Sequence, residues 1–291
     1  MKLIDGVSIA KTIQDRIKST IAKLQNRPPG LAFVRIGDNS ASLSYIRMKK
    51  KRCKEVGIIS FDVELPSHVS DDQIILEIKR LNQDPIVDGI LVQLPLPEKI
   101  NSFLIMQMID PEKDVDGFNP FNMGKLLLGE RDGFIPCTPH GIHVLLTQSQ
   151  ISLLGKHVVI VGRSNIVGKP LAALLMQKAP HCNATITLVH SFSEKLEEIC
   201  RQADVLIAAI GKPAFIKKNM VKPQAVVVDV GINHIMNNQG EKQLVGDVAF
   251  DEVAPNCSYI TPVPGGVGPM TISMLLSNTL LSYQRKTKMI I

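Results

Sequence analysis

Apolar residues in the first hundred positions alternate between helical and extended spacing. Between Ser8 and Leu24 they recur every three or four residues along one stripe, and Ser8 is placed to cap a helix. The pattern predicts helices over residues 8–24, 41–56 and from 70 onward, and strands over residues 31–36, 61–65 and 89–93. Because the strands are separated by helices, we expect parallel crossovers and therefore an α/β domain.

The same alternation returns after residue 150. Strand candidates cover residues 157–161, 184–189, 204–209 and 225–230, and a last helix is predicted from about residue 270 to 284. Residues 100–140 are rich in Pro, Gly and Asn, so we expect a functional loop or a linker there and place a domain boundary in it. The chain is thus predicted to fold as two α/β domains.

Composition narrows the class of protein. The 291 residues are 45% hydrophobic and 21% charged, which is enough for two ordinary cores. Trp is absent and aromatic residues make up 4%, which disfavours a stacking surface for single-stranded nucleic acid. The five cysteines are scattered without a C-x-x-C pair, so we expect no disulfide framework, no metal site and a cytoplasmic location. We also expect neither a secretory signal nor a membrane span.

The net charge of +6 contains one dense basic run, Lys49-Lys-Lys-Arg-Cys-Lys54, inside a predicted helix. A solvated helix face is the usual interpretation of such a run. An anion or phosphate site is a second interpretation, and a nucleic-acid arm is a third.

A strand, a glycine turn and a helix start meet in the middle of the chain. The apolar strand His157–Val161 runs into Gly162-Arg-Ser-Asn-Ile-Val-Gly168, and Pro170 suits the first turn of a helix predicted over residues 171–178. Unpaired amide hydrogens and the helix dipole would face a phosphate there. Since Ser164 replaces the second glycine of G-x-G-x-x-G and Gly168 falls one residue late, an ordinary βα turn is the alternative. The further strands in the same rhythm favour a Rossmann-like dinucleotide site.

Charge at this loop favours NADP over NAD. Sites for NAD usually place an acidic residue at the end of the second strand, to bind the ribose 2′-hydroxyl. Here that strand ends in His190-Ser191, and a cation, Arg163, lies in the first loop instead. Arg163, Ser191 and His190 could bind a 2′-phosphate. A solvated loop arginine is the alternative.

A second set of polar residues lies in the first domain. Ser42, Tyr45 and Lys49 share one helix face, and a lysine whose pKa is lowered by desolvation or a neighbouring cation can transfer protons. A basic surface helix with one packed tyrosine is the alternative interpretation. Gln93 closes a buried strand at the sheet edge where open α/β folds bind ligands.

The segment KDVDGF carries two carboxylates, Asp114 and Asp116, that could accept hydrogen bonds from an amino-substituted ring. An Asx-turn before Gly117 is the alternative.

Taken together, these segments resemble the bifunctional methylenetetrahydrofolate dehydrogenase/cyclohydrolase family almost from end to end. The matching stretches are SLSYIRMKKKRCKEVGI, GILVQLPLP, PEKDVDGFNPFNMGKL, IPCTPHGI, VVIVGRSNIVGKP, VVVDVGIN, VGDV and ITPVPGGVGPMT. The resemblance implies two domains, with a folate-binding catalytic domain over residues 1–138 and 269–291. The last helix returns to that domain. A Rossmann-like NADP-binding domain is implied over residues 139–268, and a homodimer is typical of the family.

The resemblance also implies roles for individual residues. Lys49 resembles the catalytic lysine, Tyr45 the tyrosine that stacks on the folate, Gln93 the glutamine that tunes the lysine, and Asp116 the aspartate that anchors the pterin ring. The residues assigned to the cofactor are Gly162, Arg163, Ser164, Ile166, Gly168, His190, Ser191, Gly231, Ile232 and Thr271. The residues assigned to the substrate, besides the first four, are Pro264, Gly265 and Gly266.

The implied activity is oxidation of 5,10-methylenetetrahydrofolate with NADP, followed by hydrolysis of the methenyl product to 10-formyltetrahydrofolate. Two rival functions remain. Another two-domain NADP oxidoreductase, such as a shikimate or amino-acid dehydrogenase, would share the nucleotide loop. A basic nucleic-acid-binding protein would use the run from Lys49 to Lys54 and would show steep salt dependence.

Overall fold

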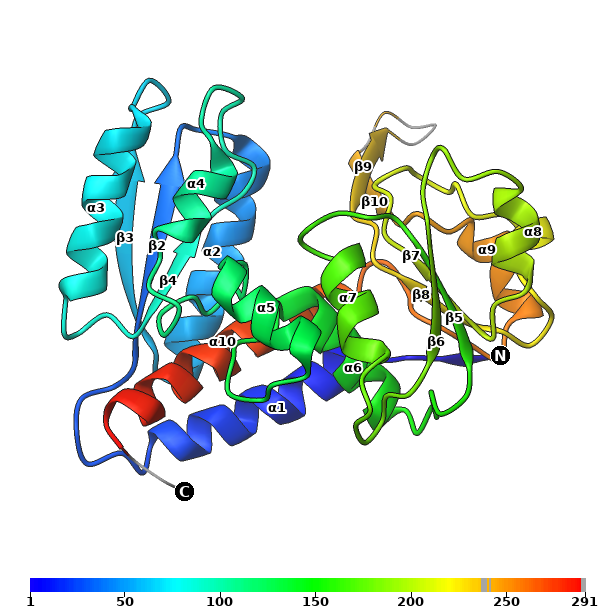
Figure 1. Cartoon of the computed structure of the whole chain (residues 1–291), viewed down its shortest axis with the longest axis horizontal. Helices are drawn as coiled ribbons and strands as arrows, with labels where there is room; N and C mark the ends of the chain where they lie inside the picture. Colours follow the sequence, from blue (N-terminus) through cyan, green and yellow to red (C-terminus); the bar gives the residue numbers. More distant parts are fainter. Residues whose placement is uncertain (237–239, 241, 289–291) are drawn as a thin grey trace. The chain divides into compact units, whose positions relative to one another are not determined.

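The structure is a computed structural model that describes residues 1–236, 240 and 242–288, with the backbone alone at residues 40–42. The chain divides into two compact units, coloured by sequence in Figure 1. Domain I comprises Thr12–Cys137 and the chain from Ile272 onward, and domain II comprises Met1–Lys11 and Thr138–Thr271. The sequence placed residues 1–11 in the first domain. Their place in domain II follows from strand β1 (Lys2–Leu3), which pairs in parallel with β11 (Tyr259–Ile260).

Domain I contains a three-stranded parallel sheet in the order β3-β2-β4. Its strands are β2 (Gly30–Ile36), β3 (Ile59–Leu65) and β4 (Gly89–Val92), and its helices are α1 (Gly6–Ile21, begun in domain II), α2 (Ser40–Val56), α3 (Asp71–Gln83), α4 (Ser102–Gln107), α5 (Pro120–Leu128) and most of α10 (Val267–Lys286). The core of this sheet is apolar: Ala32, Val34, Ile90 and Ile78 are each completely buried. The predicted α/β alternation is confirmed here.

Two local expectations change in domain I. The region 100–140 was expected to be irregular, but it contains α4, α5 and the start of α6, because Asn101 and Asn119 cap short apolar segments with their side chains. The predicted cap at Ser8 is wrong. Ser8 lies inside α1, where its amide donates to the Asp5 carboxylate at 3.0 Å.

Domain II contains a six-stranded parallel sheet in the order β1-β11-β8-β7-β5-β6 and a separate antiparallel hairpin. The other strands are β5 (His157–Val161), β6 (Thr185–Val189), β7 (Val205–Ala208) and β8 (Val226–Asp229), with the hairpin formed by β9 (Asn233–Met236) and β10 (Lys242–Val245). The helical segments are α6 (Cys137–Gln148), α7 (Gly168–Leu175), α8 (Leu196–Arg201), α9 (Phe250–Val253) and the 3-10 turns η1 (Lys218–Met220) and η2 (Ala254–Asn256). This arrangement is the predicted Rossmann-like fold.

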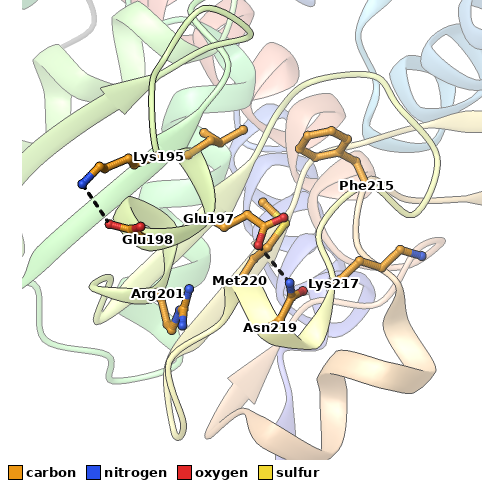
Figure 2. Close-up of a pocket in the computed structure, with 9 residues that line it drawn as sticks. Lys195, Glu197, Glu198, Arg201, Phe215, Lys217, Asn219 and Met220 are labelled. Atoms are coloured by element: carbon orange, nitrogen blue, oxygen red, sulfur yellow. Dashed lines mark hydrogen bonds and ion pairs between the residues drawn. The ribbon is translucent and has the colours of Figure 1, made fainter.

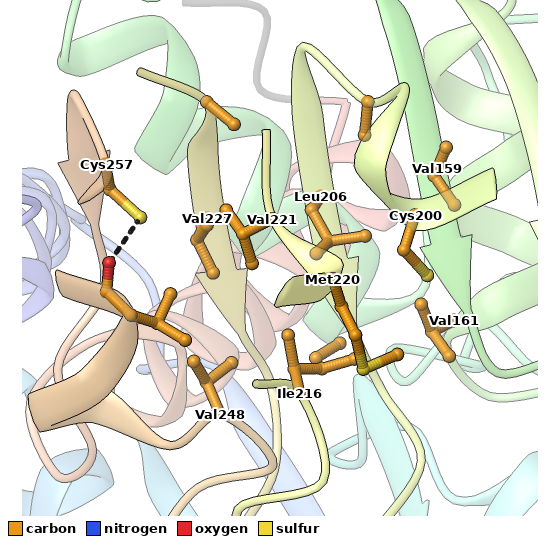
Figure 3. Packing of buried hydrophobic residues seen from close by; sticks show 14 of the residues in the cluster. Val159, Val161, Cys200, Leu206, Ile216, Met220, Val221, Val227, Val248 and Cys257 are labelled. Atoms are coloured by element: carbon orange, nitrogen blue, oxygen red, sulfur yellow. Dashed lines mark hydrogen bonds between the residues drawn. The ribbon is translucent and has the colours of Figure 1, made fainter. Parts of the chain in front are cut away.

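The core of domain II forms between the sheet and the helical segments α8, η1 and α9, which follow β6, β7 and β10. Figure 3 shows valines of β5 and β8 meeting Leu206 of β7, Met220 and Cys200 in one apolar cluster. Such a core holds the strands in register, so that their carboxyl ends form a rigid edge. That edge is where open parallel sheets bind ligands. No helix in the described part of the chain is long and apolar enough to cross a membrane.

Candidate active site

Lys49 occupies a core position of α2. From residue 43 to the end of that helix the buried residues are Ile46, Lys49, Cys53 and Val56, spaced three or four apart, and Lys49 is only 6% exposed. Lysine is almost never buried without a partner. Its burial therefore excludes the solvated-face interpretation at this position.

Two side chains lie against the Lys49 ammonium. Nζ donates to Oε1 of Gln93 at 3.1 Å and lies 5.0 Å from the centre of the Tyr45 ring. Nε2 of Gln93 donates to the carbonyl of Leu94 at 2.6 Å, which fixes the amide so that its oxygen faces the lysine. The side chain of Ser42, predicted on the same face, lies outside the described residues.

Asp116 reaches this cluster because the segment before it runs along β4. Ile90 of β4 donates its amide to the carbonyl of Lys113 at 2.8 Å, and a side chain at Gly89 would overlap the methyl groups of Val115. The structure therefore brings together Tyr45, Lys49, Gln93 and Asp116, which the sequence had named from three separate stretches.

Burial sets the protonation of the cluster. It lowers the pKa of Lys49 below the ordinary 10.5, while the charge of Asp116 works in the opposite direction. Burial also raises the pKa of Asp116, against the pull of Lys49, and raises the pKa of Tyr45 to about 12. A lysine with a lowered pKa, beside a phenol that stays protonated, gives up its proton more readily than a solvated lysine and can therefore accept and return one during a reaction.

Asp114 has a structural task. Its carboxylate accepts from the amides of Phe118 and Asn119 at 3.1 and 2.8 Å and from Nδ2 of Asn122 at 2.9 Å. The turn-forming alternative therefore describes Asp114, and Asp116 is the carboxylate that faces the lysine.

The basic run is divided between the core, ion pairs and one surface hollow. Lys49 is buried, Lys50 pairs with Asp62 at 2.5 Å, and Arg52 pairs with Glu55 at 2.6 Å. Lys50, Lys51 and Lys54 line one hollow with Arg47, but the ion pair of Lys50 and the burial of Lys49 reduce the charge that a nucleic-acid arm would present.

The nucleotide loop of domain II is built by close backbone packing. Gly162 has φ +123°, and a Cβ there would overlap the carbonyl oxygen of Ala209, while a Cβ at Gly168 would overlap the carbonyl oxygen of Gly162. Both positions therefore require glycine, although the spacing departs from the usual fingerprint. Helix α7 begins at Gly168, three residues before the predicted start, because the turn closes directly into the helix. The Ser164 hydroxyl accepts from the Val167 amide at 3.1 Å and shapes this turn.

The residues predicted to bind the 2′-phosphate lie on the surface of domain II. Arg163 and Ser191 are exposed, and within residues 1–236, 240 and 242–288 Arg163 forms no ion pair. The His190 ring is engaged locally, since its Nδ1 accepts from the Phe192 amide at 3.2 Å. Ile166 is also exposed, at 42%.

The remaining predicted residues lie in two turns of domain II. Gly231 is buried and donates its amide to Asp229 at 2.9 Å, whereas its neighbour Ile232 is 46% exposed. Pro264, Gly265 and Gly266 form the turn before α10, where Gly265 has φ +108° and a Cβ at Gly266 would crowd the Pro262 carbonyl. The hydroxyl of Thr271, in the first turns of α10, lies 3.0 Å from that of Thr138.

A separate hollow of about 500 Å³ lies on domain II around α8 and η1 (Figure 2). Four of its polar side chains form two pairs: Lys195 with Glu198 at 3.8 Å, and Asn219 with Glu197 at 3.0 Å. None of the predicted site residues lines it.

Sequence reasoning missed three buried polar residues that support these sites. Asn278 of α10 donates to the carbonyl groups of Val115 and Ile135 at 2.9 and 3.2 Å and so holds the segment that carries Asp116. Asp229 and Asp247 bind backbone amides at the ligand edge of domain II. The only sequence signal for the two aspartates was that each lies beside or close to a glycine in VVVDVGIN and VGDV.

Comparison with known proteins agrees with both halves of the molecule. Residues 4–116 match the family described as tetrahydrofolate dehydrogenase/cyclohydrolase, catalytic domain, and residues 136–287 match its NAD(P)-binding domain. The bifunctional protein FolD of Protochlamydia amoebophila is 55% identical over 285 residues, which cover 97% of this chain and 98% of that protein.

Solved structures give the same result. The bifunctional FolD enzyme of Campylobacter jejuni superposes with a TM-score of 0.93 at 44% identity, covering 98% of this chain and 99% of that one. The Trypanosoma brucei FolD structure, complexed with NADP cofactor and inhibitor, has a TM-score of 0.92 at 38% identity, covering 98% of each chain. A shikimate 5-dehydrogenase from Thermus thermophilus is 14% identical with a TM-score of 0.54, covering 89% of this chain and 94% of that one, which shows a shared fold alone. The chain belongs to the tetrahydrofolate dehydrogenase/cyclohydrolase family.

Proposed function

We propose that this protein oxidises 5,10-methylenetetrahydrofolate with NADP and hydrolyses the methenyl product to 10-formyltetrahydrofolate. The observation that carries the proposal is the buried Lys49, with a lowered pKa and a hydrogen bond to Gln93, in a chain of this family. A shikimate-type dehydrogenase is favoured less, because it matches this chain at 14% identity with a TM-score of 0.54.

The hydrolytic step needs a proton acceptor, and Lys49 supplies it. Water attacks the electrophilic carbon between the two folate nitrogens, a C–O bond forms, and the neutral amine of Lys49 takes the proton. The bond from that carbon to one nitrogen then breaks, and the proton returns to that nitrogen as the ring opens. The hydroxyl proton leaves to solvent as the formyl carbonyl forms, so that one proton is released for each cation consumed. Gln93 holds Nζ in place through its oxygen, 3.1 Å away. No oxidant is required, since water and the methenyl cation account for all the atoms.

The folate is bound by the neighbours of Lys49. The Tyr45 ring offers a flat apolar face for stacking, and the Asp116 carboxyl group suits the amino-substituted pterin ring. For the oxidative step the main contribution of these residues is to hold the methylene carbon in a fixed place.

The residues of the nucleotide loop fit a dinucleotide phosphate. The turn at Gly162 leaves no space for a side chain, so its backbone can approach a ligand closely. Arg163, an exposed cation, and the exposed Ser191 suit the 2′-phosphate. The proposed cofactor contacts in the same loop also include Gly168, Ile166 and Ser164. NADP supplies the hydride acceptor when bound.

The proposal also covers the cellular location and the oligomeric state of the protein. All five cysteines are free and buried, which supports a reducing, cytoplasmic location. A homodimer is proposed from the family resemblance, and light scattering of the purified protein would measure its mass in solution.

Substrate choice tests the proposed function directly. Purified protein is mixed with NADP and either methylenetetrahydrofolate or shikimate, and the absorbance of NADPH is followed. We expect NADPH from the folate alone. NADPH from shikimate, or none from the folate, would refute the proposal.

A further inference from the structure

We propose that Asp247 is a positioning residue for the dinucleotide: its buried carboxylate fixes the turn after β7, and the glycine turn at Gly162 rests on that turn. The inference deepens the proposed function and rests on it, because it names what shapes the cofactor loop. Asp247 touches neither reactant in this account and acts through the backbone.

The Asp247 carboxylate is saturated with hydrogen bonds, most of them from one turn. Oδ2 accepts from the amides of Ile210 and Gly211 at 2.6 and 2.9 Å, and Oδ1 accepts from the amide of Lys212 at 3.0 Å. Nδ2 of Asn233 donates to the same Oδ1 at 2.9 Å. Asp247 is 0% exposed, so these donors replace its hydration shell. Three consecutive amides directed at one carboxylate define the path of residues 210–212.

Asp229, the last residue of β8, fixes Asp247 in turn. Its Oδ1 accepts from the amides of Asp247 and Gly231 at 2.8 and 2.9 Å, and its Oδ2 accepts from the amide of Val248 at 2.9 Å. The packing is tight, because a Cβ at Gly231 would overlap Oδ1 of Asp247 and a Cβ at Gly246 would overlap Oδ2 of Asp229. The turns after β8 and β10 are thus held by one pair of carboxylates.

Close backbone packing connects the turn held by Asp247 to the nucleotide loop. The carbonyl oxygen of Ala209, next to the first amide bound by Asp247, lies where a Cβ at Gly162 would stand. The carbonyl oxygen of Gly162 in turn lies where a Cβ at Gly168 would stand, at the start of α7. With no side chain between these layers, a shift at Ile210 displaces Ala209 and then the glycine turn.

The affected protein backbone would face the part of the dinucleotide that NADP and NAD share. The glycine turn and the helix start face the pyrophosphate in folds of this class. The 2′-phosphate is the only group that distinguishes the two cofactors, and Arg163 is the residue suited to it. Loss of Asp247 should therefore weaken both cofactors by the same factor.

Asp247→Asn is the direct test. One oxygen becomes an amide donor that faces backbone donors, so the turn must rearrange. We expect the Kd for NADP and for NAD, measured by calorimetric titration without folate, each to rise about tenfold or more, equivalent to ~1.4 kcal/mol. Hydrolysis of methenyltetrahydrofolate, whose proposed proton acceptor lies in domain I and which needs no cofactor, should stay within about twofold of wild type. The matched control is Asp251→Asn, an exposed aspartate of α9 that should change neither value.

A milder variant covers the case in which Asp247→Asn does not fold. Asn233→Ala removes one side-chain donor to Asp247 and leaves the three backbone amides, so we expect a rise of about threefold in both Kd values. Unchanged Kd values in a folded Asp247→Asn or in Asn233→Ala would overturn the proposal. So would a loss of hydrolysis equal to the loss of cofactor binding, because a general structural defect would produce it. Failure of the proposed function would show instead as inactivity of the wild-type protein.

Discussion

Replacement of Lys49 by methionine tests the chemistry assigned to domain I. Methionine has similar length and no titratable group, so it fits a position that is 6% exposed while it removes the proton acceptor. Proton transfer by a positioned side chain contributes about 10²–10⁴-fold to rate, or ~3–5 kcal/mol of barrier. We therefore expect hydrolysis of methenyltetrahydrofolate to fall by about two to four orders of magnitude.

Stability should change little in the same variant, because two effects oppose each other. The hydrogen bond from Nζ to Gln93 contributes about 1 kcal/mol, and it is lost. Against this, burial had lowered the pKa of Lys49, which shows that the folded state disfavours the charged amine. Between that lowered pKa and 10.5 the unfolded chain binds more protons than the folded one, so the folded state is destabilised as the pH falls through this window. Methionine removes that penalty. We expect a melting temperature within a few degrees of wild type.

The assay supplies methenyltetrahydrofolate directly and follows the loss of its absorbance, with NADP binding measured separately by titration. Lys51→Met, at an exposed position of the same helix, is the matched control and should hydrolyse normally. Normal hydrolysis by Lys49→Met would remove the lysine from the mechanism. A large loss of NADP affinity would show that the substitution acts beyond domain I.

Three further substitutions test the remaining assignments. Arg163→Ala should raise the Kd for NADP by about tenfold or more and leave NAD nearly unchanged in parallel titrations; equal losses would refute the phosphate role. Asp116→Asn removes a charge that raises the pKa of Lys49, so the limb of the hydrolysis pH profile should move to lower pH while folate affinity falls; an unmoved limb with wild-type affinity would exclude Asp116 from the site. Asn278→Ala removes the amide donor from two backbone carbonyl groups, of which that of Val115 keeps the Cys137 thiol, and should cost about 1–3 kcal/mol in a denaturant titration; unchanged stability would show that the bonds contribute nothing.

The sequence predicted those helices and strands whose apolar residues recur at a regular spacing. Alternating apolar runs located β5 over residues 157–161 without error and β2 to within one residue. The two-residue strand β1 has no period, and it forms only because Tyr259 and Ile260, far along the chain, offer an edge. That pairing places the first eleven residues in domain II, which no local pattern indicates.

Local sequence patterns were also insufficient to predict the surroundings of the site residues. Lys49 was identified through its neighbour Tyr45, yet the basic run around it gave no sign of its burial. The sign was the apolar spacing of Ile46, Cys53 and Val56 on either side. Asp247 was not assigned a role, because its partners lie 35 to 37 residues earlier in the chain. Hydrogen bonds from backbone amides leave no trace in the residue types that donate them.

The central claim, that one chain carries both activities, is tested most directly by a trace at two wavelengths. Wild-type protein is mixed with methylenetetrahydrofolate and NADP, and NADPH and the methenyl compound are recorded together. An enzyme-free sample gives the spontaneous hydrolysis rate. We predict that more NADPH than methenyl compound accumulates, and that the difference exceeds the amount lost by spontaneous hydrolysis. The reason is that hydrolysis assisted by Lys49 consumes the methenyl compound. Equal accumulation of the two, or no NADPH at all, would contradict the account.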